Sequence, residues 1–225
     1  MIKGILFDLD NTLVDFEKMR KLAVDAAISS MKDCGLKIAE SRIRKILKEV
    51  YEEKGSEYGE VFQEMMKKTL GKVDDKILAA GIVAYRRVKY SYLDAYPGTI
   101  ALLNTLKARG YKIAIVSDAP RLKAWERLVC MKIHNHFNAV ITYDDTKKTK
   151  PDSLPFRKAL NILKLKPSEV IMVGNDLRRD ILGANKMKIV SVFAQYGRYK
   201  IGNLKIKPNY TIKEPLEVLD LVKNI

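Results

Sequence analysis

Chemically active side chains follow several short apolar runs of this sequence. Asp8 and Asp10 come after the run 2–7, and Ser117 comes after the run 112–116. Lys150 lies in the loop beyond a third apolar run. Parallel strands deliver the residues at their carboxyl ends to one edge of a sheet, where ligands bind. If these runs are strands, the side chains that follow them form one site.

Acidic residues dominate this set, because Asp176 and Asp180 follow a fourth run, 170–173. Carboxylates as close as Asp8 and Asp10 repel each other unless a cation lies between them or one of them holds a proton. Taken alone, each acid is equally typical of a turn or a helix cap. Together they favour a hard cation such as Mg²⁺, which takes few carboxylates and leaves room for water and phosphate. The pattern predicts metal-assisted chemistry on an anion.

Ser117 and Lys150 are the residues expected to bind that anion. The Ser117 hydroxyl and the backbone N–H groups after it could hold phosphate oxygens. Lys150 could neutralise the charge on a transferring phosphoryl group. The alternatives are that Ser117 caps the next helix and that Lys150 is a solvated loop lysine beside Lys147 and Lys148.

The elements that position these residues alternate between strand and helix. We expect strands at 2–7, 112–116, 139–142, 170–173 and 189–193, and helices at 100–109, 122–129, 155–163, 179–186 and 216–222. Short buried strands alternating with helices of about ten residues indicate a parallel sheet covered on both faces. The expected fold class is α/β, with a doubly wound, Rossmann-like parallel sheet as its core.

An all-helical insertion interrupts this alternation. Helices are expected at 16–33, 40–54, 57–70 and 74–93, with glycines between them and Ser56 as an N-cap. We therefore predict a catalytic core of residues 1–14 and 95–225 and an α-helical cap domain of residues 15–94. At helical positions, we expect one aromatic residue and four methionines to be buried, namely Trp125, Met31, Met65, Met66 and Met131.

Composition bounds the class of protein. The 225 residues carry 42 Lys and Arg against 27 Asp and Glu, a formal charge of +15, but the basic residues are scattered, which disfavours a nucleic-acid partner. A hydrophobic content of 47% excludes wholesale disorder. No apolar run approaches the roughly 20 residues of a membrane span, and the first residues lack a signal-peptide pattern. With only Cys34 and Cys130 as cysteines, we expect a soluble cytoplasmic protein.

The same residues, in this order, resemble the four motifs of the haloacid dehalogenase superfamily of hydrolases. The motifs are Asp8-Leu9-Asp10-Asn11-Thr12, the strand ending in Ser117, Lys150-Pro151, and Gly174-Asn175-Asp176-Leu177-Arg178-Arg179-Asp180. The helical insertion between the first and second motifs is similar to the α-helical cap of that family. The resemblance covers essentially the whole chain.

The resemblance implies a Mg²⁺-dependent phosphatase that hydrolyses a small phosphorylated metabolite through an aspartyl-phosphate intermediate. Asp8 would attack phosphorus, and Asp10 would act first as general acid and then as general base. Ser117 and Lys150 would hold the phosphoryl oxygens. Dehalogenating members usually lack an acid at the position of Asp10, so this residue favours phosphate over haloacid.

The metal ligands implied by the resemblance are the Asp8 carboxylate, the Asp10 backbone carbonyl and Asp176, with Asp180 as a second ligand or a support. The fourth motif more often reads Gly-Asp, whereas Asn175 follows Gly174 here. Both Asn175 and Asp176 are therefore candidates for the ligand.

Two other functions remain alternatives. One is a phosphoglucomutase-type phosphotransfer enzyme on the same scaffold, and the other is a basic nucleic-acid-binding or regulatory protein that has kept the fold. The motifs specify neither the physiological substrate nor the oligomeric state.

Overall fold

The computed structural model describes residues 1–55, 57–197 and 205–225. Ser56, expected as an N-cap, lies outside the described residues. The chain divides into two compact units, one made of residues 1–17 and 93–225 and the other of residues 18–92. We call them the α/β unit and the helical unit. Within the described part of the chain, no helix combines the length and apolarity that a membrane crossing requires.

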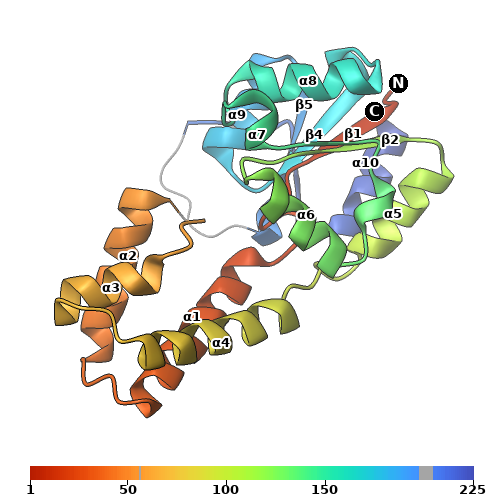
Figure 1. Cartoon of the computed structure of the whole chain (residues 1–225). Helices are drawn as coiled ribbons and strands as arrows, with labels where there is room; N and C mark the ends of the chain where they lie inside the picture. The colour runs from red at the N-terminus through yellow and green to blue at the C-terminus, as the bar shows by residue number, and fades with distance from the viewer. Residues whose placement is uncertain (56, 198–204) are drawn as a thin grey trace. The chain divides into compact units, whose positions relative to one another are not determined.

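A parallel sheet of six strands lies at the centre of the α/β unit (Figure 1). Its order is β3-β2-β1-β4-β5-β6, and every neighbouring pair is parallel. The strands are β1 (Gly4–Phe7), β2 (Lys112–Val116), β3 (Ala139–Ile141), β4 (Val170–Gly174), β5 (Val190–Ala194) and β6 (Tyr210–Ile212). The expected α/β class is confirmed, and the short edge strand β6 is an addition to the strands expected from the sequence.

Helices connect these strands and cover the sheet. They are α5 (Thr99–Ala108), α6 (Arg121–Cys130), α7 (Tyr143–Thr146), α8 (Ser153–Leu163), α9 (Leu182–Lys186) and α10 (Val218–Asn224), with a π-helical turn, η3 (Leu177–Ile181), directly before α9. The helix expected at 179–186 is therefore divided between η3 and α9.

Each face of the sheet is buried by a different set of helices. Leu6 and Ala114 pack with Phe156 of α8 on one face. Successive strand residues point to opposite faces, so Ile5 and Ile113 face the other side, where α5 packs against β2. Figure 1 shows α8 and α5 on opposite sides of the sheet. Burial on both faces explains why the central strands are continuous apolar runs.

The helical unit carries the insertion, and the expected helical cap region is confirmed. Its helices are α1 (Phe16–Asp33), α2 (Glu40–Lys54), α3 (Val61–Leu70) and α4 (Asp75–Ser91). They surround an apolar core of their own that includes Met31, Met65 and Met66. Phe62 and Tyr85 meet there edge to face, with ring centroids 5.7 Å apart.

The expectation that Trp125 is buried is wrong. Trp125 is 37% exposed, whereas Met131 is buried like the three methionines of the helical unit. Ala124 and Leu128 take the inward positions on α6. Because an α-helix has 3.6 residues per turn, the position next to Ala124 is rotated away from the sheet.

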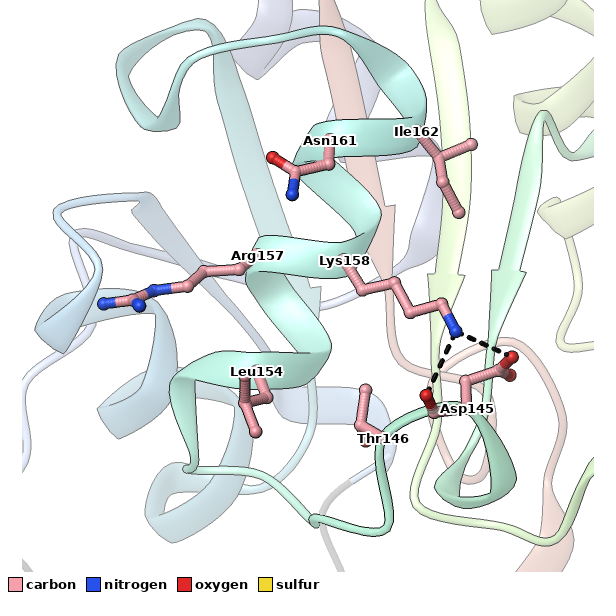
Figure 2. A pocket seen from close by; sticks show the side chains of 7 residues that line it. All are labelled: Asp145, Thr146, Leu154, Arg157, Lys158, Asn161 and Ile162. Carbon is pink, nitrogen blue, oxygen red and sulfur yellow. Dashed lines mark hydrogen bonds and ion pairs between the residues drawn. The ribbon is translucent and has the colours of Figure 1, made fainter.

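Asp145 ties α7 to α8. Its Oδ2 accepts hydrogen bonds from the Thr142 backbone N–H at 2.9 Å and from the Thr142 hydroxyl at 2.8 Å. Its Oδ1 lies 3.2 Å from Lys158 Nζ, a pair that Figure 2 shows. Both residues line a pocket of about 470 Å³ between the two helices. Burial raises the pKa of Asp145, but the Thr142 hydrogen bonds and Lys158 outweigh it and lower that pKa to about 2.

Substituting Asp145→Asn tests this link through pH. The folded-state pKa lies below the ordinary value, so the carboxylate stabilises the fold above about pH 4, and this contribution disappears as the pH falls toward 2. We expect the variant to lose about 1 kcal/mol of unfolding free energy near neutral pH and to converge on the wild type below about pH 3. Urea unfolding across this range measures the difference. Asp220→Asn, at an exposed position of α10, is the control, and an Asp145→Asn deficit that does not change with pH would contradict the assignment.

Candidate active site

The strand register brings the expected site residues to one edge of the sheet. Phe7, the last residue of β1, lies opposite Ile115 of β2 and Val173 of β4. Asp8 continues this alignment, and its backbone N–H donates to Val173 O at 2.9 Å. Ser117 directly follows β2. The first, second and fourth motifs therefore meet beside the carboxyl end of the central strand.

Lys150 is the buried centre of this site. It is only 3% exposed, and its Nζ lies 2.5 Å from Asp8 Oδ1 and 2.7 Å from Asp180 Oδ1. It also donates to the Val116 carbonyl at 2.7 Å. Burial lowers the pKa of the Lys150 ammonium, but the charges of Asp180 and Asp8 outweigh this and raise it. Lys150 is thus a fixed positive charge, and the alternative of a solvated loop lysine is excluded.

Asp180 reaches Lys150 because Gly174 leaves space for it. A Cβ on Gly174 would lie 2.4 Å from the Asp180 carboxyl carbon and from Oδ2. Asp180 Oδ2 accepts a hydrogen bond from the Asp176 backbone N–H at 2.9 Å. Burial raises the pKa of Asp180 to about 7, with Lys150 opposing the rise and Asp8 adding to it. The Asp180 carboxylate therefore links Lys150 to the backbone of the turn after β4.

Thr12 and Asn175 lie on the other side of Asp8. The Thr12 hydroxyl is 3.1 Å from Asp8 Oδ2 and 3.3 Å from Asn175 Oδ1. Asn175 Nδ2 donates to the Gly197 carbonyl at 2.9 Å, and this bond directs the amide oxygen toward Thr12 and Asp8. A Cβ on Gly197 would overlap the Asn11 carbonyl oxygen, at 1.4 Å, so only glycine permits this approach.

These oxygens fit a hard cation. Asp8 Oδ2 and Asn175 Oδ1 converge on one hydroxyl, which has a single proton to donate, and Mg²⁺ prefers such oxygen ligands. Among the described residues, no three His, Cys, Asp or Glu side chains are placed to hold a metal together. Lys150 and Arg127 pair with the carboxylates that the spacing had suggested as a cluster. A cation therefore fits beside Asp8 and Asn175 rather than among four aspartates.

Asp176, one of the expected metal ligands, bonds through its carboxylate to the backbone of the turn that follows it. Its Oδ1 accepts from the backbone N–H groups of Arg178 at 2.8 Å and Arg179 at 3.2 Å, and the side chain is 43% exposed. It is the N-cap of η3. A short carboxylate at a helix start satisfies N–H groups that otherwise have no partner, and this local bond takes Asp176 away from the site.

The loop after β2 contributes Ser117 and Asp118. The Ser117 hydroxyl accepts from the Ala119 N–H at 3.2 Å and still carries a proton that it can donate to an anion. Asp118 Oδ1 accepts from the Lys150 backbone N–H at 2.9 Å, and its Oδ2 lies 3.4 Å from Arg179 Nη1. Asp118 therefore joins the second, third and fourth motifs.

Sequence reasoning missed two residues that hold the first motif. Arg127 of α6 pairs with Asp10, its Nε lying 2.9 Å from Asp10 Oδ1. The Tyr196 hydroxyl donates to the Thr12 carbonyl at 2.9 Å. The one signal in the sequence was an arginine at an inward position of α6, between Ala124 and Leu128; Tyr196 gave no signal.

Comparison with known proteins identifies the family. Residues 5–194 match the family model of haloacid dehalogenase-like hydrolases. The chain belongs to this family. The expected resemblance, the α/β core and the helical cap region are all confirmed for this haloacid dehalogenase-like hydrolase.

Its curated relatives hydrolyse phosphate compounds. A glyceraldehyde 3-phosphate phosphatase of Methanocaldococcus jannaschii is 38% identical over 225 residues, which is 100% of this chain and 99% of the relative. A putative pyrophosphatase of Clostridium perfringens is 30% identical over 230 residues, or 100% of this chain and 99% of the relative. The protein is accordingly an enzyme, a haloacid dehalogenase-like phosphatase.

Among solved structures, a putative hydrolase of the same family from Bacillus subtilis, bound to magnesium, has a similar fold. Its TM-score is 0.70 at 22% identity, with 100% of this chain and 99% of that chain covered. At this identity the likeness shows the shared fold.

Gly174→Ala tests whether the position of Asp180 matters. The added methyl group must displace the Asp180 carboxylate, so we expect a loss of about 1–3 kcal/mol in stability and at least a tenfold loss of phosphatase activity, of the order that displaced catalytic groups cause. Thermal unfolding and phosphate release measure the two effects. Gly59→Ala is the matched control, because a Cβ there meets nothing within 4 Å. Full activity of Gly174→Ala would contradict the role given to Asp180.

Proposed function

We propose that this phosphatase depends on Mg²⁺ and hydrolyses a small phosphorylated metabolite, in the first place glyceraldehyde 3-phosphate, through a phosphoryl group carried on Asp8. The arrangement around Asp8 carries the proposal, with Lys150 Nζ on one carboxylate oxygen and the Thr12 hydroxyl on the other. The archaeal relative, matched along its whole length, supports the choice of substrate.

The chemistry follows from this arrangement. A carboxylate oxygen of Asp8 attacks phosphorus, the bond between phosphorus and the ester oxygen breaks, and Asp10 gives its proton to the departing alkoxide. A water molecule then returns a proton to Asp10, attacks phosphorus and breaks its bond to Asp8, which releases inorganic phosphate. Ser117 and Lys150 hold the phosphoryl oxygens during both steps.

The ligands for Mg²⁺ are the Asp8 carboxylate, the Asn175 amide oxygen and the Asp10 backbone carbonyl. When bound, Mg²⁺ neutralises negative charge on the phosphoryl oxygens. Asp180 supports this set by holding Lys150 in place. Asp176 stabilises the turn that follows Asn175.

Pyrophosphate is the second candidate substrate, because the clostridial relative is a putative pyrophosphatase that also matches the whole chain.

The mutase and nucleic-acid alternatives predict different experimental results. A phosphoglucomutase-type enzyme would return the phosphoryl group to a sugar instead of releasing it, and a nucleic-acid binder would bind DNA with an affinity that falls steeply with salt.

Asp8→Asn tests the nucleophile. Phosphate release from glyceraldehyde 3-phosphate, pyrophosphate and glycerol 3-phosphate is compared in Mg²⁺ and in EDTA. We expect the wild type to prefer glyceraldehyde 3-phosphate and to lose activity in EDTA. Because the proposed mechanism needs the Asp8 carboxylate as its nucleophile, Asp8→Asn should lose at least about 10³-fold in kcat. Asp220→Asn, an exposed aspartate on α10, should retain full activity, and an Asp8→Asn variant that stays active would refute the mechanism.

Asn175→Ala and Asp176→Ala separate the two candidate metal ligands. Asn175→Ala removes a ligand, so the Mg²⁺ concentration at half-maximal activity should rise about tenfold or more. Asp176→Ala removes a cap, so it should lower stability by about 1 kcal/mol and leave the Mg²⁺ dependence almost unchanged. Magnesium titrations and thermal unfolding of both variants give the answer. The opposite pattern would assign the ligand to Asp176.

A further inference from the structure

Arg127 is a buried arginine that the proposed chemistry does not yet use. It lies on α6 and is only 3% exposed. Its Nε is 2.9 Å from Oδ1 of Asp10, whose side chain is 26% exposed. Its guanidinium carbon lies 4.3 Å from the centroid of the Phe16 ring, at the start of α1.

Packing alone does not explain an arginine at this position. The neighbouring inward residues of α6, Ala124 and Leu128, are small or apolar. A buried guanidinium carries a desolvation cost that only a well-placed partner offsets, and an apolar side chain would fill the same space without it. Asp10, in the first motif, is such a partner for Arg127.

The geometry fixes the direction of the Asp10 carboxylate. The Phe16 ring covers one face of the planar guanidinium, and the guanidinium has few orientations left in which Nε can meet Oδ1. The Phe16 ring thus supports the side chain of Arg127.

We propose that Arg127 is a positioning residue. It holds the Asp10 carboxylate in the orientation in which Asp10 delivers a proton to the departing oxygen and then receives one from water. The inference rests on the general acid–base role of Asp10 in the proposed function. Proton transfer by a positioned side chain contributes about 10²–10⁴-fold to a rate, and that contribution depends on the orientation that Arg127 imposes.

The test compares two substrates whose leaving groups differ in their need for a proton. 4-Nitrophenolate departs without protonation, whereas an alkoxide needs the acid. The value of kcat/KM reports the steps up to phosphoryl transfer onto Asp8. For Arg127→Met we expect kcat/KM to fall at least about tenfold with an alkyl phosphate and less than about threefold with 4-nitrophenyl phosphate. Arg127→Lys keeps the charge but not the planar fork, so it should recover part of the alkyl phosphate activity.

Arg121→Met is the matched control, since Arg121 is an exposed arginine on the same helix; both substrates should react with it as with the wild type. Retained 4-nitrophenyl phosphate activity also shows that Arg127→Met is folded. If that variant does not fold, the comparison is made with Arg127→Lys, which should lose more activity with the alkyl phosphate than with the aryl phosphate. Equal losses with both substrates, or a rise in KM alone, would overturn the proposal in favour of a structural or substrate-binding role.

The proposed function fails in a different way from this inference. If Asp8→Asn retained activity on 4-nitrophenyl phosphate, the role of Asp8 as nucleophile would be refuted, whatever the result for the Arg127 variants. The Arg127 comparison is unaffected if the wild type fails to hydrolyse glyceraldehyde 3-phosphate. In that case, glycerol 3-phosphate or another alkyl phosphate that the wild type hydrolyses serves as the alkyl substrate.

Discussion

The ammonium group of Lys150, enclosed by Asp8, Asp180 and the Val116 carbonyl, fixes the site that this fold carries. These partners come from the ends of three different strands or the turns after them, so one side chain determines how closely those segments approach. Removing it would leave two buried carboxylates facing each other, which costs on the order of 3–5 kcal/mol. The same ammonium group contacts the Asp8 carboxylate, which the proposed mechanism makes the acceptor of the phosphoryl group.

Close backbone approach is the second condition on which the site depends. Gly174 admits the Asp180 carboxylate, and Gly197 lies against the Asn11 carbonyl. Asn175 binds the loop after β5 to the fourth motif by donating to Gly197 O, and Tyr196 binds the same loop to the first motif by donating to Thr12 O. The orientation of Asn175 follows from its bond to Gly197 O, which leaves its amide oxygen 3.3 Å from the Thr12 hydroxyl.

Much of this was predictable from the sequence, because apolar runs and strand-end residues are local patterns. The order of strands and helices, and the meeting of Asp8, Ser117, Lys150 and Asp180, followed from parallel topology. The choice between Asn175 and Asp176 as candidate metal ligand did not follow from the topology, because it depends on which of the two residues caps the next turn. Arg127 was missed because its partner, Asp10, is distant in sequence. The edge strand β6 has three residues with only Ile212 buried, too few for a pattern. The charge of +15 was a weaker guide than the motifs: Lys150 and Arg127, which contact Asp8 and Asp10, are two of 42 basic residues.

The central claim is that Asp8 carries the phosphoryl group and that Asp10 is needed to remove it. Rapid-quench analysis of Asp10→Asn with 4-nitrophenyl phosphate and Mg²⁺ tests this most directly, because formation of the intermediate needs no acid there and its breakdown lacks a base. The account predicts a burst of one equivalent of 4-nitrophenolate per enzyme, followed by slow turnover, with mass spectrometry locating the phosphoryl group on Asp8. The absence of both burst and label, or a label on another residue, would contradict it.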